Sequence, residues 1–250
     1  LVLRALRLGH DPVDVIRCCT LNPARHYSLK IGLLQPGDPA DIAVVDDLDH
    51  FKVLRTYIAG RMVAENGKTL LQSVPEETPN KFLAKPLNEE DIRTIPSGDT
   101  VHVIVALEGQ LITHHAVECG LLAGVPFQSD ISRDILKLVV LNRYQPSAPA
   151  VAFIRNFGLK TGAIASTVAH DSHNIIAVGT SDREIVSAIN ALVETGGGIC
   201  CSDSGRVSLL PLPVAGLMST GDGYRVAEQY ESLTRLAREM GSSLRSPFMT

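Results

Sequence analysis

The amino-acid sequence predicts an α+β fold, in which a small antiparallel unit is followed by a mixed α+β domain. Three observations support this prediction. Short runs of β-branched and apolar residues, separated by turn residues, recur through most of the 250 residues. Two late segments, at about residues 182–195 and from about residue 222, have the apolar spacing of amphipathic helices. Strands that come in runs, with helices grouped apart from them, are typical of α+β proteins rather than of a regular βαβ repeat.

A helix is expected near the start of the chain. Asp11 can accept hydrogen bonds from the amides of a first turn, and Pro12 supplies the φ angle of the first helical position. The apolar residues that follow have a roughly helical period as far as Asn22 and Pro23. We expect the helix to end or restart there, because proline lacks the amide that a helix interior requires.

Residues 28–74 are expected to form a small antiparallel unit. Residues 40–46 are typical of a short strand, and the turns at residues 60–61 and 66–67 indicate two successive hairpins. Residues 75–95 are rich in Pro, Glu, Asn and Lys and have little periodicity, so we expect a linker. Residues 96–250 then form the second domain.

The second domain is expected to be mostly strands with two helices. A capping box at residues 181–184 starts the first helix, and the glycines at 196–198 end it. We interpret these glycines as a helix C-cap rather than a phosphate cradle, because they follow a helix and no P-loop lysine is present. The first six expected strands are residues 100–107, 110–117, 135–141, 151–155, 162–169 and 174–179, and two more follow at 199–201 and 207–210.

Charge and cysteine content restrict the partners and the compartment. With 23 Lys and Arg against 27 Asp and Glu the net charge is -4, and no basic run occurs, so we expect no nucleic-acid or membrane binding. The 5 cysteines include two adjacent pairs, which predicts reduced thiols and a cytoplasmic location. The sequence starts without methionine inside an apolar, helix-like pattern, so we expect a piece of a longer protein.

The densest polar cluster is His-Asp-Ser-His-Asn at residues 170–174, between two strand-like runs. His170 and His173 can face one ligand if the turn is helical, and Asp171 can orient an imidazole or accept a proton. An ordinary strand-to-strand turn is the alternative, since Asp, Ser and Asn are common turn residues. The sequence therefore offers His170, Asp171 and His173 as candidate catalytic residues, with both interpretations open.

The other motifs give no support for a catalytic or metal site. The sequence has no His-x-His, no Cys-x-x-Cys, no His-Glu-x-x-His and no Gly-x-Ser-x-Gly. His114 and His115 are neighbours in a strand-like run, so their side chains point to opposite faces and cannot chelate one ion together. We expect one of them to be half-buried and the other exposed.

Two sets of segments carry a family resemblance. Residues 21–25 (LNPAR) and 32–46 (GLLQPGDPADIAVVD) resemble the region just after the barrel of amidohydrolase-superfamily enzymes. Residues 158–175, which include His-Asp-Ser-His-Asn, together with the glycines at 196–198 and the Leu-Pro-Leu-Pro segment at 210–219, closely resemble the adenine deaminase family. The resemblance covers essentially the whole chain.

The resemblance implies an architecture. Residues 1–27 would be the end of a TIM-type barrel whose other parts are missing, 28–74 part of a small β-sandwich, and 96–250 a truncated adenine deaminase C-terminal domain. It also implies metal-dependent hydrolysis of adenine to hypoxanthine and ammonia in purine salvage, with Mn2+ or Fe2+ as the metal. The family's metal ligands would all precede Leu1, so this chain would hold none and would be inactive alone.

The remaining expectations concern the 170–174 segment and the partners. His170, Asp171 and His173 would either enclose the substrate at the barrel mouth or stabilise a domain or dimer interface. Adenine is the expected small-molecule partner, and a homo-oligomer is expected. Two alternative functions stay open at this point: another amidohydrolase that acts on a cyclic amide, and a non-catalytic interaction or oligomerisation module.

Overall fold

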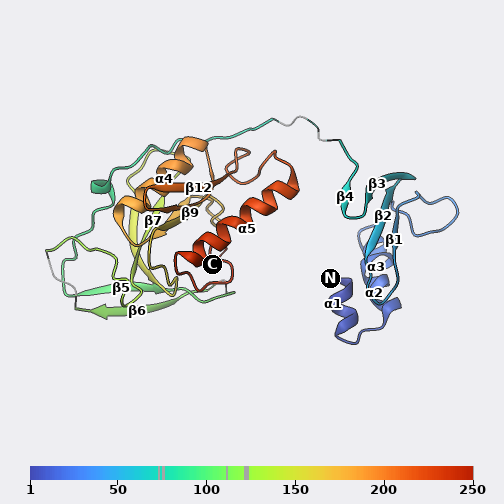
Figure 1. The fold of residues 1–250 in the computed structure, drawn as a ribbon, viewed down its shortest axis with the longest axis horizontal. Helices are drawn as coiled ribbons and strands as arrows, with labels where there is room; N and C mark the ends of the chain where they lie inside the picture. The colour runs from blue at the N-terminus through green and yellow to red at the C-terminus, as the bar shows by residue number, and fades with distance from the viewer. Residues whose placement is uncertain (73, 75–76, 111, 121–123, 250) are drawn as a thin grey trace. The chain divides into compact units, whose positions relative to one another are not determined.

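The computed structural model describes residues 1–72, 74, 77–110, 112–120 and 124–249. The chain forms two compact units, Leu1–Val74 and Pro75–Thr250 (Figure 1). Both units contain helices and sheet, which confirms the predicted α+β class. Among the described residues, no helix is long and apolar enough to cross a membrane.

The first unit combines three short helices with one antiparallel sheet. Its strands follow the order β1-β2-β3-β4. The described residues of this unit form one sheet, and the expected small sandwich stays a prediction. The elements are α1 (Val2–Arg7), α2 (Pro12–Cys19), α3 (Leu21–His26), β1 (Ile42–Val45), β2 (Val53–Ile58), β3 (Arg61–Glu65) and β4 (Lys68–Thr69).

Local signals account for most of this unit. The Asp11 side chain accepts hydrogen bonds from the amides of Val13 and Asp14 at 2.9 and 3.1 Å, so it caps α2 as predicted. Asn22 and Pro23 lie inside α3 rather than between helices. Pro23 is tolerated there because it falls in the first turn, where an amide would have no intrahelical partner.

The second unit is built on an eight-stranded sheet with the order β12-β11-β9-β10-β7-β8-β5-β6. All neighbouring pairs are antiparallel except β5 and β8. The elements are η1 (Glu89–Ile92), β5 (Thr100–Val105), β6 (His114–Cys119), β7 (Leu136–Leu141), β8 (Ala150–Arg155), β9 (Ala163–Ser166), β10 (Ile175–Gly179), α4 (Asp182–Thr195), β11 (Gly198–Asp203), β12 (Arg206–Pro211) and α5 (Gly223–Glu239).

Helices α4 and α5 cover opposite faces of this sheet (Figure 1). Alternate residues of β7 show the division, since Leu138 packs into the cluster that contains α5 and Val139 into the cluster that contains α4. Ser181 caps α4 by accepting from the amide of Glu184, and Gly196 ends the helix with a left-handed φ of 69°. Both ends of α4 are therefore those that the sequence predicts.

The segment expected to be a linker at residues 75–95 differs from that expectation. Residues 75–76 lie outside the described residues, but residues further along pack onto the second unit. Ile92 of η1 is fully buried against the α4 side of the sheet. The amide of Leu87 donates to the Asn190 side chain at 2.8 Å, and the same side chain donates back at 2.9 Å. Apolar residues in this Pro- and Glu-rich segment pack against α4 and complete the core there. The average composition of the segment does not reveal them.

The expected strand at residues 110–117 is shifted. Residue 111 lies outside the described residues, and β6 runs from His114 to Cys119. His114 and His115 do point to opposite faces, because they pair with Val105 and Ile104 of β5. Both are exposed, however, so the expectation of one half-buried histidine was wrong. The reason is that β6 is an edge strand with one neighbour.

Candidate functional site at the 170–174 loop

The predicted polar segment forms a tight loop between β9 and β10. The amide of His173 donates to the carbonyl of Ala169 at 2.6 Å, which closes a tight, non-helical turn. His170 and His173 consequently lie on the same turn, with ring centroids 5.6 Å apart and ring planes 52° apart. The structure thus brings the two histidines and Asp171 into one turn, while their catalytic role stays a prediction.

Burial divides these residues into two pairs. The side chains of His170 and Asp171 are 74% and 103% exposed, and their Nδ1 and Oδ1 atoms are 3.2 Å apart. His173 and Asn174 are half-buried. Their Nδ1 and Oδ1 atoms are the buried side-chain polar atoms that have no hydrogen-bond partner in the described part of the chain. A buried polar atom without a partner is destabilising by about 1–3 kcal/mol, so these two atoms are the unusual feature of the loop.

Arg143 contacts this loop through the main-chain carbonyl of His173. It follows β7 by two residues and is only 3% exposed. Its Nε donates to the carbonyl of His173, and one Nη donates to the carbonyl of Ala215 at 2.6 Å. The other Nη donates to the hydroxyl of Tyr144 at 2.9 Å. One side chain therefore fixes two loops that are far apart in the sequence.

The positive charge of Arg143 has no acidic partner nearby. Within the described ranges, no Asp or Glu oxygen lies within 4.0 Å of its guanidinium. Carbonyl and hydroxyl oxygens satisfy three of its five N–H donors, but they do not neutralise the charge. A buried positive charge therefore lies next to the loop. It favours hydrogen-bond acceptors with electron-rich atoms at this end of the sheet.

Thr167 connects the other two segments. Its hydroxyl donates to the carbonyl of Gly216 at 2.6 Å and accepts from the amide of Gly198 at 2.9 Å. Its own amide donates to the carbonyl of Gly198 at 3.0 Å. Gly216 has a φ of +67°, and a methyl group there would overlap the Arg143 guanidinium, so only glycine fits at this approach.

The sheet topology explains why these segments meet. Strands β7, β9 and β12 end, and β10 and β11 begin, at the same end of the antiparallel sheet. The loops that follow or precede them must therefore lie side by side. We call residues 167–174, 196–198 and 212–218, together with Arg143, the loop cluster. It includes residues 196–198 and parts of the other two segments, 158–175 and 210–219, that carry the resemblance in the second domain.

Sequence reasoning did not find Arg143 or Thr167. Arg143 follows a run of buried strand residues, where a charged side chain is unusual, and that is the one local signal. Its partners lie 30 and 72 residues further along the chain, so only the strand order reveals them.

The described residues do not supply a fitting catalytic metal site. Asp46, Asp47 and His50 form the one group of three potential ligands found among them with donor atoms within 4.8 Å of one another, and all three are exposed. Asp46 already accepts from the amides of Asp47 and Lys52 at 2.8 and 2.7 Å, and Asp47 Oδ2 lies 2.8 Å from His50 Nδ1. This set is an exposed turn that is hydrogen-bonded within itself, whereas catalytic metal ligands are oriented by an outer shell in a shaped cavity.

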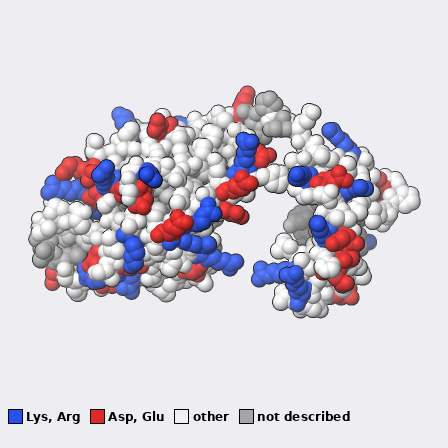
Figure 2. Space-filling view, viewed as in Figure 1, with Lys and Arg blue, Asp and Glu red and all other residues white. Residues whose placement is uncertain are grey.

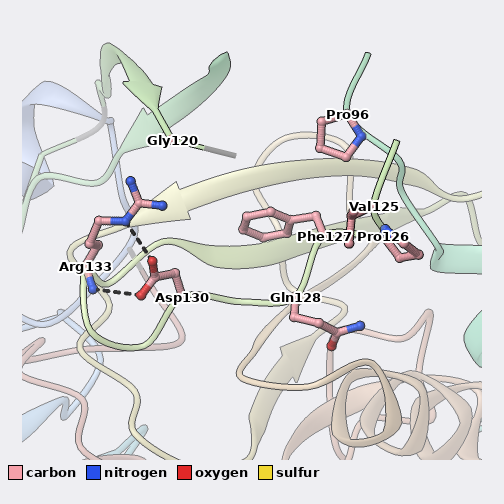
Figure 3. A pocket seen from close by; sticks show the side chains of 8 residues that line it. All are labelled: Pro96, Gly120, Val125, Pro126, Phe127, Gln128, Asp130 and Arg133. Carbon is pink, nitrogen blue, oxygen red and sulfur yellow. Dashed lines mark hydrogen bonds and ion pairs between the residues drawn. The ribbon is translucent and has the colours of Figure 1, made fainter. Parts of the chain in front are cut away.

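A shallow cavity of about 220 Å3 lies elsewhere in the second unit (Figure 3). Figure 3 shows Asp130 and Arg133 turned toward each other at one side, with an Nε to Oδ2 distance of 2.7 Å. Arg133 also donates to the carbonyl of Cys119 at 2.7 Å. These charged groups are thus partnered within the protein. None of His170, Asp171 and His173 lines this cavity.

Charged side chains of both signs are mixed on the face of the molecule that is drawn. Figure 2 shows Lys and Arg interspersed with Asp and Glu on this face, without a broad area of one sign. Such mixing gives no general attraction for a polyanion there.

Comparison with known proteins identifies the two parts of the chain. Residues 2–63 match the amidohydrolase family. Residues 110–250 match the family described as the adenine deaminase C-terminal domain. Because that match covers more than half of the 250 residues, the chain belongs to the adenine deaminase C-terminal domain family.

Curated relatives match the whole chain. An adenine deaminase of Sulfurovum sp. (strain NBC37-1) is 48% identical over 100% of this chain and 45% of its own length. Those of Salinibacter ruber and Methanosarcina barkeri are 47% and 45% identical, again over 100% of this chain, and over 46% and 47% of their own lengths. The chain thus spans about half the length of the curated relatives it matches.

Proposed function

We propose that the protein to which this chain belongs is an adenine deaminase, which hydrolyses adenine to hypoxanthine and ammonia. The observation that carries the proposal is the identity of 45–48% with three proteins named adenine deaminase along the entire chain. Within it, residues 1–27 would end the barrel, 28–74 would belong to the small sandwich, and 96–250 would form the C-terminal domain.

The second unit favours adenine over the substrates of other amidohydrolases. The match at residues 2–63 is to the general amidohydrolase family. The match at residues 110–250 is to a domain described by one activity. An amidohydrolase that acts on another cyclic amide would share the first match and has no reason to share the second.

In this proposal, the metal ion of the reaction is bound by residues that are not part of this chain. Membership of the relatives' family supports a divalent ion, and we propose Mn2+ or Fe2+. Asp46, Asp47 and His50 do not fit that role, because they are exposed and hydrogen-bonded to one another and to the backbone. No catalytic step is therefore assigned to them.

For the loop cluster, we propose that residues 170–174 form part of the substrate enclosure. The support is the pair of buried, unpartnered atoms, His173 Nδ1 and Asn174 Oδ1. A purine base carries both N–H donors and ring-nitrogen acceptors, so it can satisfy an imidazole nitrogen and an amide oxygen together. In this proposal His173 contacts the base, His170 and Asp171 lie at the solvent side, and Arg143 positions the loop. The alternative is that a domain or dimer interface satisfies the same two atoms.

Ammonia release from adenine tests the proposed activity. The whole protein would be treated with a chelator and assayed with and without added Mn2+. We expect ammonia and hypoxanthine in equal amounts after Mn2+ is restored. No release under either condition would contradict the proposal and favour the non-catalytic interaction or oligomerisation module.

Two further expectations stay predictions. The cytoplasmic location rests on the cysteine pattern and the homo-oligomer on the resemblance alone. Fractionation of cells would test the first, and sedimentation of the whole protein would test the second.

A further inference from the structure

Two histidines from neighbouring strands meet at the edge of the large sheet. The Nδ1 of His102, in β5, lies 2.6 Å from the Nε2 of His115, in β6. The ring centroids are 4.9 Å apart and the ring planes differ by 23°, so the two rings meet through these nitrogens rather than face to face. Two imidazole nitrogens therefore converge on one point, 13 residues apart in the sequence.

The strand register explains this meeting. His102 pairs with Val117, and Ile104 pairs with His115, so the two histidines are diagonal neighbours on one face of the hairpin. The opposite face of β5 is buried through Val101 and Val103. The histidine face is open, since both His102 and His115 are exposed and β6 is an edge strand (Figure 1).

We propose that His102 and His115 form a binding site for a borderline divalent transition-metal ion such as Zn2+, Ni2+ or Cu2+. Neutral imidazole is a preferred ligand of these ions. With zinc–nitrogen bonds of about 2.0–2.1 Å at a tetrahedral angle, two ligand nitrogens lie about 3.3 Å apart. Binding an ion therefore requires both exposed side chains to rotate, so that the separation widens from 2.6 Å and both nitrogens turn toward the ion.

The proton balance is simple. In the observed contact, one ring nitrogen donates and the other accepts. To bind the ion, the donor ring moves its proton to its other nitrogen, which is a change of tautomer without net proton release. No third histidine, cysteine or carboxylate of the described residues joins the two nitrogens within 4.8 Å, so water would complete the coordination. The site thus keeps open positions at which an external ligand can bind.

The chain provides a matched control. His114 is also exposed, lies next to His115 in β6, and points to the opposite face, where it pairs with Val105. A Zn2+ ion held by the convergent pair depends on His102 and His115 but not on His114. Adventitious binding by any surface histidine would depend on all three alike.

Calorimetric titration of the whole protein with ZnCl2 tests the site. We expect His102→Ala and His115→Ala each to weaken one Zn2+ equivalent by at least about tenfold, and His114→Ala to leave it unchanged. His102→Gln, which keeps the polarity of the side chain, serves as a second variant if His102→Ala fails to fold. Unchanged Zn2+ affinity in the His102 and His115 variants, or equal losses in all three, would overturn the proposal. This readout does not involve adenine turnover, so its failure is distinguishable from failure of the proposed deaminase activity.

Discussion

The guanidinium Nε of Arg143 donates a hydrogen bond to the main-chain carbonyl of His173, 30 residues further along the chain. This bond joins the end of β7 to the loop before β10. Because the same guanidinium also holds the carbonyl of Ala215, one buried cation organises two of the three segments in the loop cluster.

Replacement of Arg143 should destabilise the second unit. Arg143→Met removes three hydrogen bonds and leaves the carbonyls of His173 and Ala215 without a donor. We expect a loss of about 2–4 kcal/mol in the free energy of unfolding, measured by urea denaturation. Arg143→Lys should recover only part of it, because an ammonium cannot reproduce the planar fork. The exposed Arg225→Met is the control, and an equal loss there would contradict this role.

The Thr167 hydroxyl should contribute more to the free energy of unfolding than its methyl group does. Thr167→Val keeps the shape but removes the donor to Gly216 and the acceptor for Gly198. We expect about 1–3 kcal/mol of destabilisation in urea unfolding, because the amide of Gly198 and the carbonyl of Gly216 then lack that partner. Thr167→Ser should restore most of the stability. If serine is no better than valine, packing rather than hydrogen bonding explains the position.

Asp130 should stabilise the fold in a pH-dependent way. Hydrogen bonds from the Ser132 hydroxyl and from Arg133 lower its pKa from 3.8 to about 2. A lowered folded-state pKa contributes stability that is present above pH 3.8 and is lost as the pH falls toward 2.

The corresponding experiment compares Asp130→Asn with the unmodified chain. Since the Asp130 side chain is 29% exposed, we expect a deficit of only about 1–2 kcal/mol at pH 7. The deficit should narrow as the pH is lowered below about 4, as followed by urea unfolding at several pH values. A deficit that does not change with pH would contradict the charge-based explanation, and the exposed Asp99→Asn controls for loss of a carboxylate.

The exposed pair of Asp47 and His50 should be visible by NMR. The hydrogen bond and charge of Asp47 raise the pKa of His50 above 6.5, and the His50 amide and ring lower the pKa of Asp47. A raised histidine pKa favours the folded state below the unfolded-state value and loses that effect as the pH rises through the folded-state value. We expect the His50 titration to move back toward 6.5 in Asp47→Asn. An unchanged midpoint would show that the pair is not formed in solution.

The cysteines should differ in reactivity. Burial raises the pKa of the Cys201 thiol to about 12 and raises that of Cys200 still further, whereas Cys119 is exposed. Because the thiolate is the reacting species, a thiol reagent at pH 8 should label Cys119 and leave Cys200 and Cys201 unmodified until urea unfolds the chain. Mass spectrometry of peptides would locate the label. Rapid labelling of Cys200 in the native chain would contradict the buried placement of β11.

The sequence predicted those features that depend on nearby residues. Asp11 and Ser181 cap their helices as expected, because a cap involves only the next three residues. The contacts of Arg143 were not predictable, because they depend on the order β9-β10-β7, which no local pattern encodes. The buried packing of Leu87 and Ile92 was missed for a related reason, since a segment rich in Pro and Glu becomes ordered through tertiary contacts with α4.

We propose that His173 contacts the substrate in the proposed adenine deamination, and one kinetic comparison tests this role most directly. His173→Ala in the whole protein would be assayed for kcat/KM with adenine and for Tm, with the exposed Ser172→Ala as the control from the same loop. We predict that kcat/KM falls by at least about tenfold while Tm changes by no more than about 2 °C. A kcat/KM equal to that of the unmodified protein, with a lowered Tm, would contradict the claim and assign the loop to an interface.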